Sequence, residues 1–417
     1  MKRLFLAMML VVPVNLGAQE SPTLAVMIVV DQLRGDLLEH YGPAFTGGFR
    51  RLLDEGFHFT QASHAHARTA TAPGHSTLTT GVHPARHGIV ANSWQQRVNF
   101  QWENTYAVAD PDSPILGFEM EPLLPGRSPV NLQRAGLPDW FETADDDSRR
   151  VSISRKDRAA IPMGAQGTEF VFWLLPELAR FITSTHYMDR YPRWLDRFNE
   201  REMPDIFGPQ VWMSGIPAEY RYLARADTAG FEFDGVHTSF PHLSASENPD
   251  DSQAQHYVWA SELPYADEAV KALAEVAIDE LDLGKRDNVD YLALSFSSTD
   301  RVGHQFGPFS PEVFSTLLHL DDLLGELFET LDDEVGPGGW VVGLAGDHGV
   351  VTMPEYAQAQ GNAEAERLSR GEVLADLSGA LNEAVRDGGS PEVVADRLAE
   401  AVLALDFIEG AYTHTEL

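Results

Sequence analysis

The stretch that decides the fold is Leu24–Asp31, which reads LAVMIVVD. Its seven consecutive apolar residues, rich in Val and Ile, predict a strand that is buried on both faces of a parallel sheet. Similar strands are predicted at Asp290–Phe296 (DYLALSF) and Trp340–Ala345 (WVVGLA). Helical segments separate them, so we expect an α/β fold with a mostly parallel, doubly wound central sheet. Ligands of such sheets bind beyond the carboxyl ends of the strands.

Helical periodicity is clearest at Pro311–Leu331, where apolar residues recur every three or four positions. Further helices are predicted at Phe45–Glu55, from Pro73 to about Gly81, and at about Asp267–Leu281. A short strand is predicted at Gly56–Phe59.

The alternation of predicted strands and helices is lost in the middle of the chain, where Pro, Gly and aromatic residues dominate. We interpret residues 163–266 as an inserted cap, with aromatic-rich helical pieces at 170–181 and 191–198. The catalytic α/β core is then expected in two parts, residues 19–162 and 267–417.

Composition excludes several classes of protein. The chain has 417 residues, and 43% of them are hydrophobic, which is enough for a sizeable core and excludes wholesale disorder. Lys and Arg number 30 against 63 Asp and Glu, so the formal net charge is −33. That charge argues against nucleic acid or an anionic membrane surface as a partner. Cysteine is absent, which excludes disulfides, zinc–thiolate sites and thiol nucleophiles.

The N-terminus has the layout of a secretory signal peptide. Positively charged Lys2 and Arg3 precede an apolar stretch at Leu4–Val14, and small residues follow up to Ala18. The apolar stretch is too short to span a bilayer. We therefore expect residues 1–18 to be cleaved, and the mature chain to be periplasmic or secreted without a stable membrane anchor. A buried N-terminal helix is the alternative reading.

Acidic residues and histidines follow the three predicted strands. Asp31 follows the first strand, Asp300 and His304 follow the second, and the pair Asp347–His348 follows the third. Any one carboxylate could be a helix cap or an ion-pair partner. Because parallel strands end at one edge, we expect all of these side chains to lie close together there. Carboxylate and imidazole groups are good ligands for zinc, so the sequence predicts a metal site.

A second motif, Arg68–Ser76 (RTATAPGHS), contains a candidate nucleophile. Pro73 suits the first turn of a helix, which places Thr71 just ahead of the helix N-terminus. That end of a helix attracts anions such as phosphate. Thr71 could be an ordinary N-cap, or a nucleophile if a metal ion removes its proton.

Two further segments could bind phosphate. In extended backbone Lys156 and Arg158 would project to one face, where both could contact phosphoryl oxygens. A solvated basic turn is the alternative. Asn92 could donate its amide N–H₂ to another oxygen, or it could be a turn residue.

Taken together, these motifs resemble the alkaline phosphatase superfamily, and within it the type I phosphodiesterase/nucleotide pyrophosphatase branch. The residues 156–158 (KDR) narrow the resemblance to the PafA-like alkaline phosphatases, which are phosphomonoesterases. The motifs that carry the resemblance are Val30–Arg34 (VDQLR), Thr69–His75 (TATAPGH), His87–Asn92 (HGIVAN), Ser297–Pro308 (SSTDRVGHQFGP) and Ala345–Gly349 (AGDHG).

The resemblance implies a three-layer sandwich fold and a site with two Zn²⁺ ions. Asp300 and His304 would bind one of the ions. The other would be held by four residues: Asp31, Thr71, Asp347 and His348.

The resemblance also implies a mechanism for small phosphate monoesters. Thr71 would attack phosphorus and form a covalent phosphothreonine, which water then hydrolyses. Three side chains would bind the nonbridging oxygens: Asn92, Lys156 and Arg158. Lys156 and Arg158 would favour a monoester, which carries one more negative charge than a diester.

The sequence departs from the family pattern near its end. Family members supply a third ligand to the second zinc, a His in a Thr-His-Gly motif, and no such motif follows Asp347. We do not expect His414 to replace it. The C-terminal end of the catalytic core is therefore expected to be missing from this chain.

Two alternative functions stay open. One is a phosphodiesterase or nucleotide pyrophosphatase on the same fold. The other is a non-catalytic metal- or phosphate-binding protein. A sulfatase is disfavoured, because neither Cys nor a Ser-x-Pro-x-Arg stretch occupies the nucleophile position.

Overall fold

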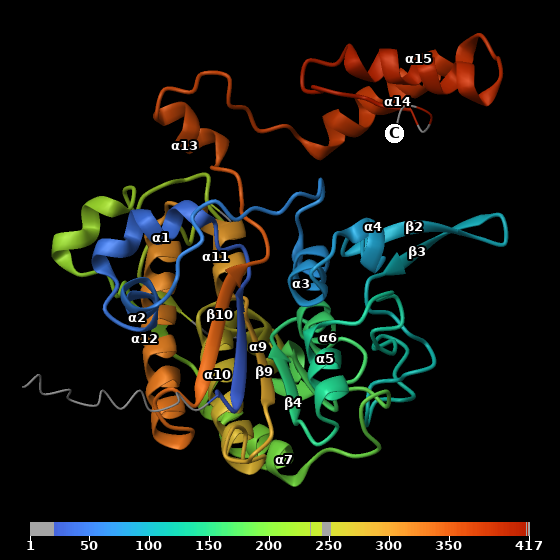
Figure 1. Cartoon of the computed structure of the whole chain (residues 1–417). Coiled ribbons are helices and arrows are strands. Elements are labelled where there is room, and N and C mark those ends of the chain that lie inside the picture. Colours follow the sequence, from blue (N-terminus) through green and yellow to red (C-terminus); the bar gives the residue numbers. More distant parts are fainter. Residues whose placement is uncertain (1–20, 234, 244–251, 414, 416–417) are drawn as a thin grey trace, which may run out of the picture. The chain divides into compact units, whose positions relative to one another are not determined.

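The structure, a computed structural model, describes residues 21–233, 235–243, 252–413 and 415. The chain divides into two compact units at Val351/Thr352 (Figure 1). The first unit contains the central sheet. The predicted signal peptide lies outside the described residues. Within the described part of the chain, no helix is both long and apolar enough to cross a membrane.

Six strands form the central sheet, in the order β10-β1-β9-β4-β5-β6. All neighbours are parallel except β5 and β6. The three strands predicted from buried apolar runs are confirmed, and they lie side by side as β10, β1 and β9. The strands are β1 (Leu24–Val30), β4 (Arg150–Ser154), β5 (Phe170–Leu175), β6 (Arg180–Ile182), β9 (Asp290–Phe296) and β10 (Trp340–Gly346).

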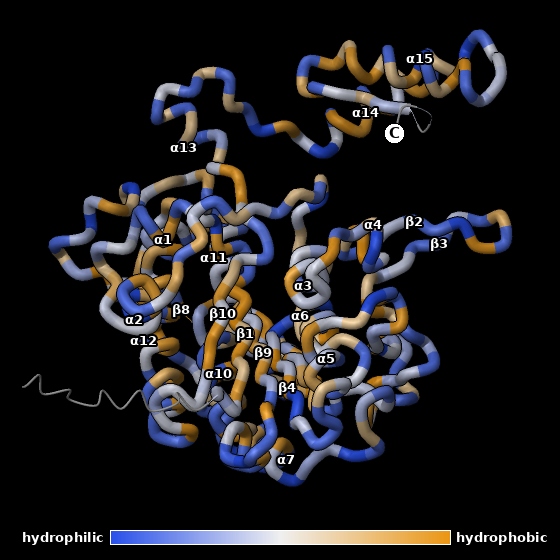
Figure 2. Tube along the Cα trace, viewed as in Figure 1, coloured by the Kyte–Doolittle hydropathy of each residue, from blue (hydrophilic) through white to orange (hydrophobic). Residues whose placement is uncertain are grey.

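Helices cover both faces of this sheet, which gives three layers (Figure 1). Alternate residues of a strand point to opposite faces. Accordingly, Val26 and Ile28 of β1 pack in the large core cluster, which contains residues of α10 (Tyr265–Glu280) and α12 (Pro311–Glu334). Val29 packs on the other face with Met163 of α6 (Asp157–Gly164). The hydrophobic residues accordingly concentrate between the layers, as the colouring of the Cα trace shows (Figure 2).

Other helices on these two faces complete the layers. They are α2 (Gly48–Glu55), α3 (Thr71–Thr80) and α5 (Leu137–Ala144). The remaining helices of the first unit are α1 (Gly35–Tyr41), α4 (Pro84–His87), α7 (Arg193–Arg201), α8 (Met203–Ile206), α9 (Gln253–Ala260) and α11 (Ser298–Phe306), with 3-10 helices at Gly42–Ala44, Pro176–Leu178 and Ala218–Leu223. Two smaller antiparallel sheets accompany the central one. A hairpin joins β2 (Ser93–Val98) to β3 (Gln101–Tyr106), and β7 (Val211–Trp212) pairs with β8 (His242–Leu243) across a long intervening segment.

The predicted helices are confirmed within a few residues at their ends, as α2, α3, α10 and α12. The strand predicted at Gly56–Phe59 is wrong, because no strand forms there. Phe57 and Phe59 are 83% and 72% exposed, so the alternating apolar residues face solvent rather than a core.

The helix predicted at residues 170–181 is also wrong. This segment forms β5 and β6, and β5 pairs with β4 in the central sheet. The run FVFWLL is short, aromatic and almost fully buried, which suits a strand better than an amphipathic helix. The helical piece at 191–198 corresponds to α7. The cap over residues 163–266 stays a prediction as a unit, although its first two strands belong to the sheet.

The second unit, Thr352–Leu417, is helical as its Ala/Glu/Leu-rich sequence predicts. It contains α13 (Pro354–Ala359), α14 (Arg370–Arg386) and α15 (Pro391–Leu403), and α14 packs against α15. The sequence assigned this region to the core, whereas the structure groups it as a unit of its own.

Candidate functional site

The carboxyl ends of β1, β9 and β10 bring three acidic residues to one edge of the sheet. Val30 pairs with Phe296 on one side and Gly346 on the other, so the three strands end in register. Asp31 and Asp347 directly follow their strands, and Asp300 lies in the first turn of α11 after β9. Ligand atoms of Asp31, Asp300 and His348 all lie within 4.8 Å of one another, and all three residues are buried.

Lys156 lies between two of these carboxylates. Its Nζ atom is 2.6 Å from Asp31 Oδ2 and 2.5 Å from Asp300 Oδ2, and its side chain is almost fully buried. Burial raises the pKa of Asp31, but the positive charge of Lys156 together with the nearby His348 and His75 outweighs burial and holds that pKa well below its ordinary value. A buried ammonium group thus compensates two buried carboxylates.

His348 adds an imidazole to the same group. Its Nε2 atom lies 3.3 Å from Asp31 Oδ1 and 3.6 Å from Asp347 Oδ2. Burial lowers the pKa of His348, but the neighbouring Asp31 carboxylate and the negative charge of Asp347 outweigh burial and raise it to about 9. His348 therefore carries a positive charge at neutral pH while no cation is bound.

His304 reaches the group from one turn further along α11. Its Nε2 atom is 3.1 Å from Asp300 Oδ1, and its side chain is 58% exposed. The i, i+4 spacing of Asp300 and His304 thus places both side chains together, as the sequence indicated.

Gln32 holds two of these carboxylates in place, although the sequence does not identify it as a site residue. Its backbone N–H donates to Asp347 Oδ1 at 2.9 Å, and its side-chain amide donates to Asp300 Oδ1 at 3.0 Å. Gln32 is buried and has a φ of +66°, which is unusual for a residue other than glycine. A Cβ atom at Gly303 would lie 2.1 Å from Gln32 Oε1, so only glycine leaves room for this side chain. The position of Gln32 directly after Asp31 is the one signal that the sequence offered.

The helix α3 begins at Thr71 and not just after it, so it starts earlier than predicted, and Thr71 is buried. Ala70 is the N-cap and makes no side-chain cap, so Thr71 does not act as one. The helix lies against the end of β10. A Cβ at Gly74 would be 2.3 Å from the Asp347 carbonyl oxygen, and His75 Nδ1 is 3.2 Å from Asp347 Oδ2.

Asn92 forms a hydrogen bond with the N-terminus of α3. Its Oδ1 atom accepts a hydrogen bond from the Ala72 backbone N–H at 2.8 Å. Because Oδ1 is occupied in this way, the amide orientation is set and the N–H₂ group is available to donate to an acceptor.

Arg158 does not share an extended strand with Lys156, because Lys156 is the N-cap of α6 and Arg158 lies in its first turn. The neighbouring Asp157 accepts hydrogen bonds from Tyr106 Oη at 2.5 Å and Arg127 Nε at 2.6 Å. Arg158 Nε is buried without a hydrogen-bond partner among the described residues. The expectation that the two cations project from one extended face is therefore wrong.

The residues of the group fit a bound metal ion. Asp31 Oδ1 and Asp347 Oδ2 are buried and accept no hydrogen bond within the described part of the chain, although His348 and His75 nitrogens lie 3.3 and 3.2 Å away. Buried oxygen atoms without a donor are costly unless a cation compensates them. Carboxylates and imidazoles in this number suit zinc.

The chain is similar to known proteins over most of its length. The profile described as type I phosphodiesterase/nucleotide pyrophosphatase matches residues 25–406. Alkaline phosphatase PhoV of Synechococcus elongatus is 35% identical over 340 residues, which cover 80% of this chain and 60% of PhoV. Alkaline phosphatase PafA of Elizabethkingia meningoseptica is 31% identical over 432 residues, which cover 98% of this chain and 76% of PafA.

Solved structures agree with the sequence relatives. The crystal structure of wild-type PafA superposes with a TM-score of 0.74 at 30% identity, covering 82% of this chain and 65% of that chain. A PafA variant, in which a threonine, an asparagine, a lysine and an arginine are replaced together, superposes with a TM-score of 0.73 at 29% identity. The chain thus spans about 60% of the length of PhoV and 65% of the crystallised PafA chain. With an α/β sheet of this order and a profile match over most of its length, the chain belongs to the type I phosphodiesterase/nucleotide pyrophosphatase family, in which several of its relatives are alkaline phosphatases.

Proposed function

We propose that the chain is a secreted, zinc-dependent alkaline phosphatase that hydrolyses small phosphate monoesters through a covalent phosphothreonine. The observation that carries this proposal is the buried group of Asp31, Asp300 and His348, whose ligand atoms lie within 4.8 Å of one another. Its relatives PhoV and PafA are named alkaline phosphatases, which supports the reaction class. Secretion rests on the signal-peptide pattern of residues 1–18.

Six residues of the chain would hold two zinc ions. Asp300 and His304 would contribute to one ion. The other would be bound by Asp31, Thr71, Asp347 and His348. When bound, the ions would lower the pKa of a hydroxyl ligand and offset the negative charge of the phosphoryl oxygens.

Thr71 is the proposed nucleophile. Its hydroxyl would lose its proton, and the oxygen would attack phosphorus in line with the leaving alkoxide, forming the Oγ–phosphorus bond as the bond to the leaving oxygen breaks. The leaving alkoxide would take up a proton from water. Water would then attack the phosphothreonine and release inorganic phosphate, which restores the Thr71 hydroxyl. The N-terminus of α3, where Thr71 lies, favours the negative charge of the phosphoryl group.

Asn92, Lys156 and Arg158 would bind the nonbridging oxygens. The Asn92 amide is oriented for this by its bond to Ala72, as described above. Lys156 is balanced by Asp31 and Asp300, and cations bound to those carboxylates would free its ammonium group for a phosphoryl oxygen. The PafA variant described above replaces the same four residue types, in the same order, as Thr71, Asn92, Lys156 and Arg158.

Hydrolysis of p-nitrophenyl phosphate by the full chain, loaded with zinc, tests the proposal. Thr71→Ala removes the nucleophile and should lower kcat/KM by about a thousandfold or more. Thr69→Ala, two residues earlier and exposed, is the matched control and should leave the rate within about twofold.

Two outcomes would overturn the proposal. One is a zinc-loaded chain that leaves the ester intact. The other is Thr71→Ala with the rate of the unmodified chain. Mass spectrometry of acid-quenched reactions should locate one phosphoryl group on Thr71, and on no other residue.

The matching family profile also supports a phosphodiesterase as a second candidate. The ratio of kcat/KM for p-nitrophenyl phosphate to that for bis-p-nitrophenyl phosphate distinguishes the two functions. We expect the ratio to favour the monoester, because Lys156 would interact with its additional negative charge. Lys156→Ala should lower this ratio of monoester to diester kcat/KM by about 10- to 100-fold, which is the effect of losing one hydrogen bond to a charged group. A ratio that favours the diester would support the second candidate.

A further inference from the structure

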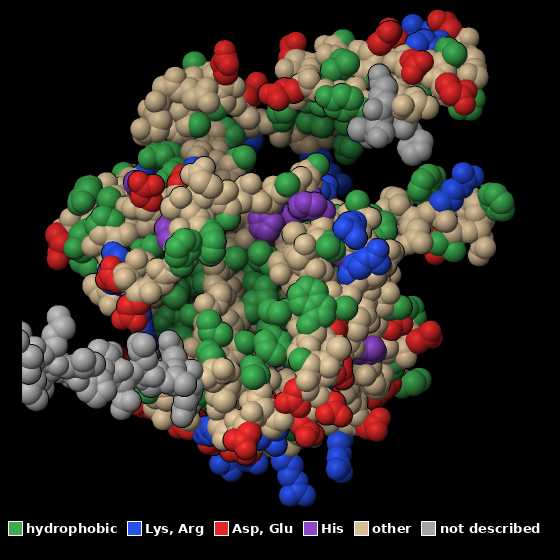
Figure 3. Space-filling view, viewed as in Figure 1, with side chains coloured by type: hydrophobic (Ala, Val, Ile, Leu, Met, Phe, Trp, Pro, Cys, Tyr) green, Lys and Arg blue, Asp and Glu red, His purple; other side chains and the backbone are tan. Residues whose placement is uncertain are grey.

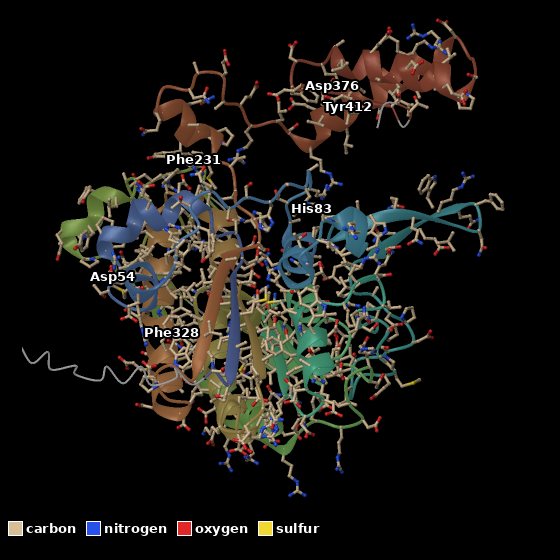
Figure 4. The ribbon with its side chains drawn as sticks, in the orientation of Figure 1. Asp54, His83, Phe231, Phe328, Asp376 and Tyr412 are labelled. Carbon is tan, nitrogen blue, oxygen red and sulfur yellow. The ribbon has the colours of Figure 1, made fainter. Side chains whose placement is uncertain are left out.

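Glu262 is an acidic residue of the first unit that the proposed reaction does not use. Many Asp and Glu side chains of that unit lie on its surface (Figure 3). Asp54 of α2, labelled in Figure 4, is an example, because 61% of its side chain is exposed in an ion pair with Arg50. Only 13% of the Glu262 side chain is exposed, and two arginines converge on its carboxylate. A buried carboxylate is retained where its partners compensate for the loss of water, so these arginines are central to its role.

The two carboxylate oxygens of Glu262, which lies just after α9, contact two different parts of the first unit. Oε1 accepts a hydrogen bond from Arg155 Nη2 at 2.5 Å. Oε2 pairs with the guanidinium group of Arg301 and accepts a longer hydrogen bond from Gln305 Nε2 at 3.4 Å. Arg155 also donates to the Ser261 carbonyl oxygen at 2.7 Å and to Ser261 Oγ at 3.0 Å. The carboxylate therefore joins the segment that follows β4 to α11.

The three side chains that bind Glu262 each stand next to a residue of the proposed site in the sequence. The neighbours are Arg155 and Lys156, Asp300 and Arg301, and His304 and Gln305. Residues four apart lie on one face of a helix, and consecutive residues are turned by about 100°. Asp300 and His304 therefore reach the acidic group, whereas the residue after each of them turns towards Glu262. In this way Glu262 holds α11 in the rotation that presents both proposed zinc ligands.

Lys156 depends on the same carboxylate through Arg155. It is the N-cap of α6 and directly follows Arg155, whose guanidinium group donates three hydrogen bonds to Ser261 and Glu262. The ammonium group of Lys156 lies between two buried carboxylates in this structure. If cations take up those carboxylates, the anchor at Arg155 would aim the ammonium group at a phosphoryl oxygen.

Removal of the negative charge of Glu262 would separate the two sides. Arg155 and Arg301 carry like charges and approach the same carboxylate, one at each oxygen. Burial lowers the pKa of Arg155, and the negative charge of Glu262 opposes that effect. Without a carboxylate between them the two guanidinium groups would repel each other, and a buried cation without its anion is unfavourable. The segment that carries Lys156 would then move away from α11.

We propose that Glu262 is a positioning residue that holds Lys156 at a set distance from α11, and that it thereby maintains the preference of the site for phosphate monoesters. It contacts neither the substrate nor an ion itself. The inference rests on the proposed function, in which Lys156 binds a nonbridging oxygen and α11 supplies Asp300 and His304 as zinc ligands. To that function Glu262 adds a link between the phosphate-binding side and the metal-binding side.

A double-mutant cycle with Lys156 tests this role through specificity. The ratio of kcat/KM for p-nitrophenyl phosphate to that for bis-p-nitrophenyl phosphate is measured on the full chain loaded with zinc. We expect Glu262→Gln to lower the ratio by about tenfold when Lys156 is present, and by less than about twofold when it is combined with Lys156→Ala. A general loss of stability lowers both rates together and leaves the ratio unchanged. Equal effects of Glu262→Gln with and without Lys156 would overturn the proposal.

Two further variants guard against a trivial explanation. Glu142→Gln is the matched control, because Glu142 pairs with buried Arg150 at the start of β4, at the opposite edge of the sheet, and it should keep the ratio within about twofold. Arg301→Gln removes the link to α11 but leaves Glu262 paired with Arg155, so no buried charge is left alone in this variant. It should lower the ratio by at least threefold. An unchanged ratio in Arg301→Gln would overturn the proposal, as would an equal fall in Glu142→Gln.

NMR of the metal-free chain separates this inference from the proposed function. The chain has four lysines, so the ¹⁵Nζ signal of Lys156 can be assigned from its absence in Lys156→Ala. We expect Glu262→Gln to shift that signal and to speed the exchange of the ammonium protons with water by at least tenfold, because the ammonium group loses its fixed position between two carboxylates. Glu142→Gln should change neither.

The two proposals can then fail independently. An unaltered Lys156 signal in Glu262→Gln would overturn the positioning role, even if the chain hydrolyses phosphate monoesters. An altered signal in a chain that hydrolyses neither ester would count against the proposed function alone, with the link between Glu262 and Lys156 upheld.

Discussion

Gln32 connects two of the candidate metal ligands although it is not a ligand itself. It donates one hydrogen bond to Asp347 and one to Asp300, which follow different strands. One oxygen of each carboxylate is thereby engaged, and the rotation of both carboxylates is restricted. Residues that hold metal ligands in this way typically contribute 10- to 100-fold to affinity or activity.

We therefore predict that Gln32→Ala weakens zinc binding at the acidic group by about 10- to 100-fold, measured by competition with a chromogenic chelator. Gln61→Ala, at an exposed glutamine, is the control and should bind zinc normally. Gly303→Ala tests the same idea from the other side, because its Cβ would displace the Gln32 side chain. Normal zinc affinity in both Gln32→Ala and Gly303→Ala would show that Gln32 does not position the ligands.

At the scale of elements, His87 ties α4 to α3 through a neutral ring. Its two nitrogens contact Thr77 of α3 and the Ile89 N–H. Burial, with a smaller effect of the nearby His66, lowers the pKa of His87 from its ordinary value of 6.5 to about 4. The folded protein thus binds this proton less readily than the unfolded chain does.

Because the folded protein binds the His87 proton less readily than the unfolded chain, a falling pH lowers the stability of the fold. His87 contributes its full stabilisation above pH 6.5, and that stabilisation is lost as the pH falls from about 6.5 towards 4. We predict that the free energy of unfolding, measured with denaturant across this range, falls less steeply in His87→Gln than in the unmodified chain. His58→Gln, at an exposed site, should leave the slope unchanged. An NMR titration that places the His87 pKa near 6.5 would contradict the prediction.

Some helices and strands could be predicted from the sequence, and others could not. β1, β9 and β10 were predictable because each is a buried apolar run that ends in polar residues. The apolar run of β5 was misread as helical, since periodicity alone does not distinguish a short buried strand from a buried helix. Gln32 was missed because its contacts depend on a positive φ and on the space at Gly303, neither of which a pattern of residue types shows.

At the scale of the whole molecule, the acid excess has two different components. The net charge is −33, and much of it lies on exposed residues such as Asp146 and Asp147. Asp31, Asp300 and Asp347 are instead buried together, with Lys156 and His348 as nearby cations. Exposed acids attract cations weakly because water and salt screen them. A buried group of acids exists only in the folded chain, so the free energy of cation binding adds to the stability of the folded state.

We therefore predict that zinc raises the melting temperature of the chain, and that a chelator reverses the change. A ligand at 100 times its Kd stabilises the folded state by about 2.7 kcal/mol. Asp300→Asn should abolish most of this increase, because it removes a carboxylate on which Lys156, His304 and Gln32 converge. Asp146→Asn, at an exposed residue of the acidic run Asp145–Asp147, should retain the full increase. Equal shifts in the two variants would mean that zinc acts through the acidic surface and not through the buried group.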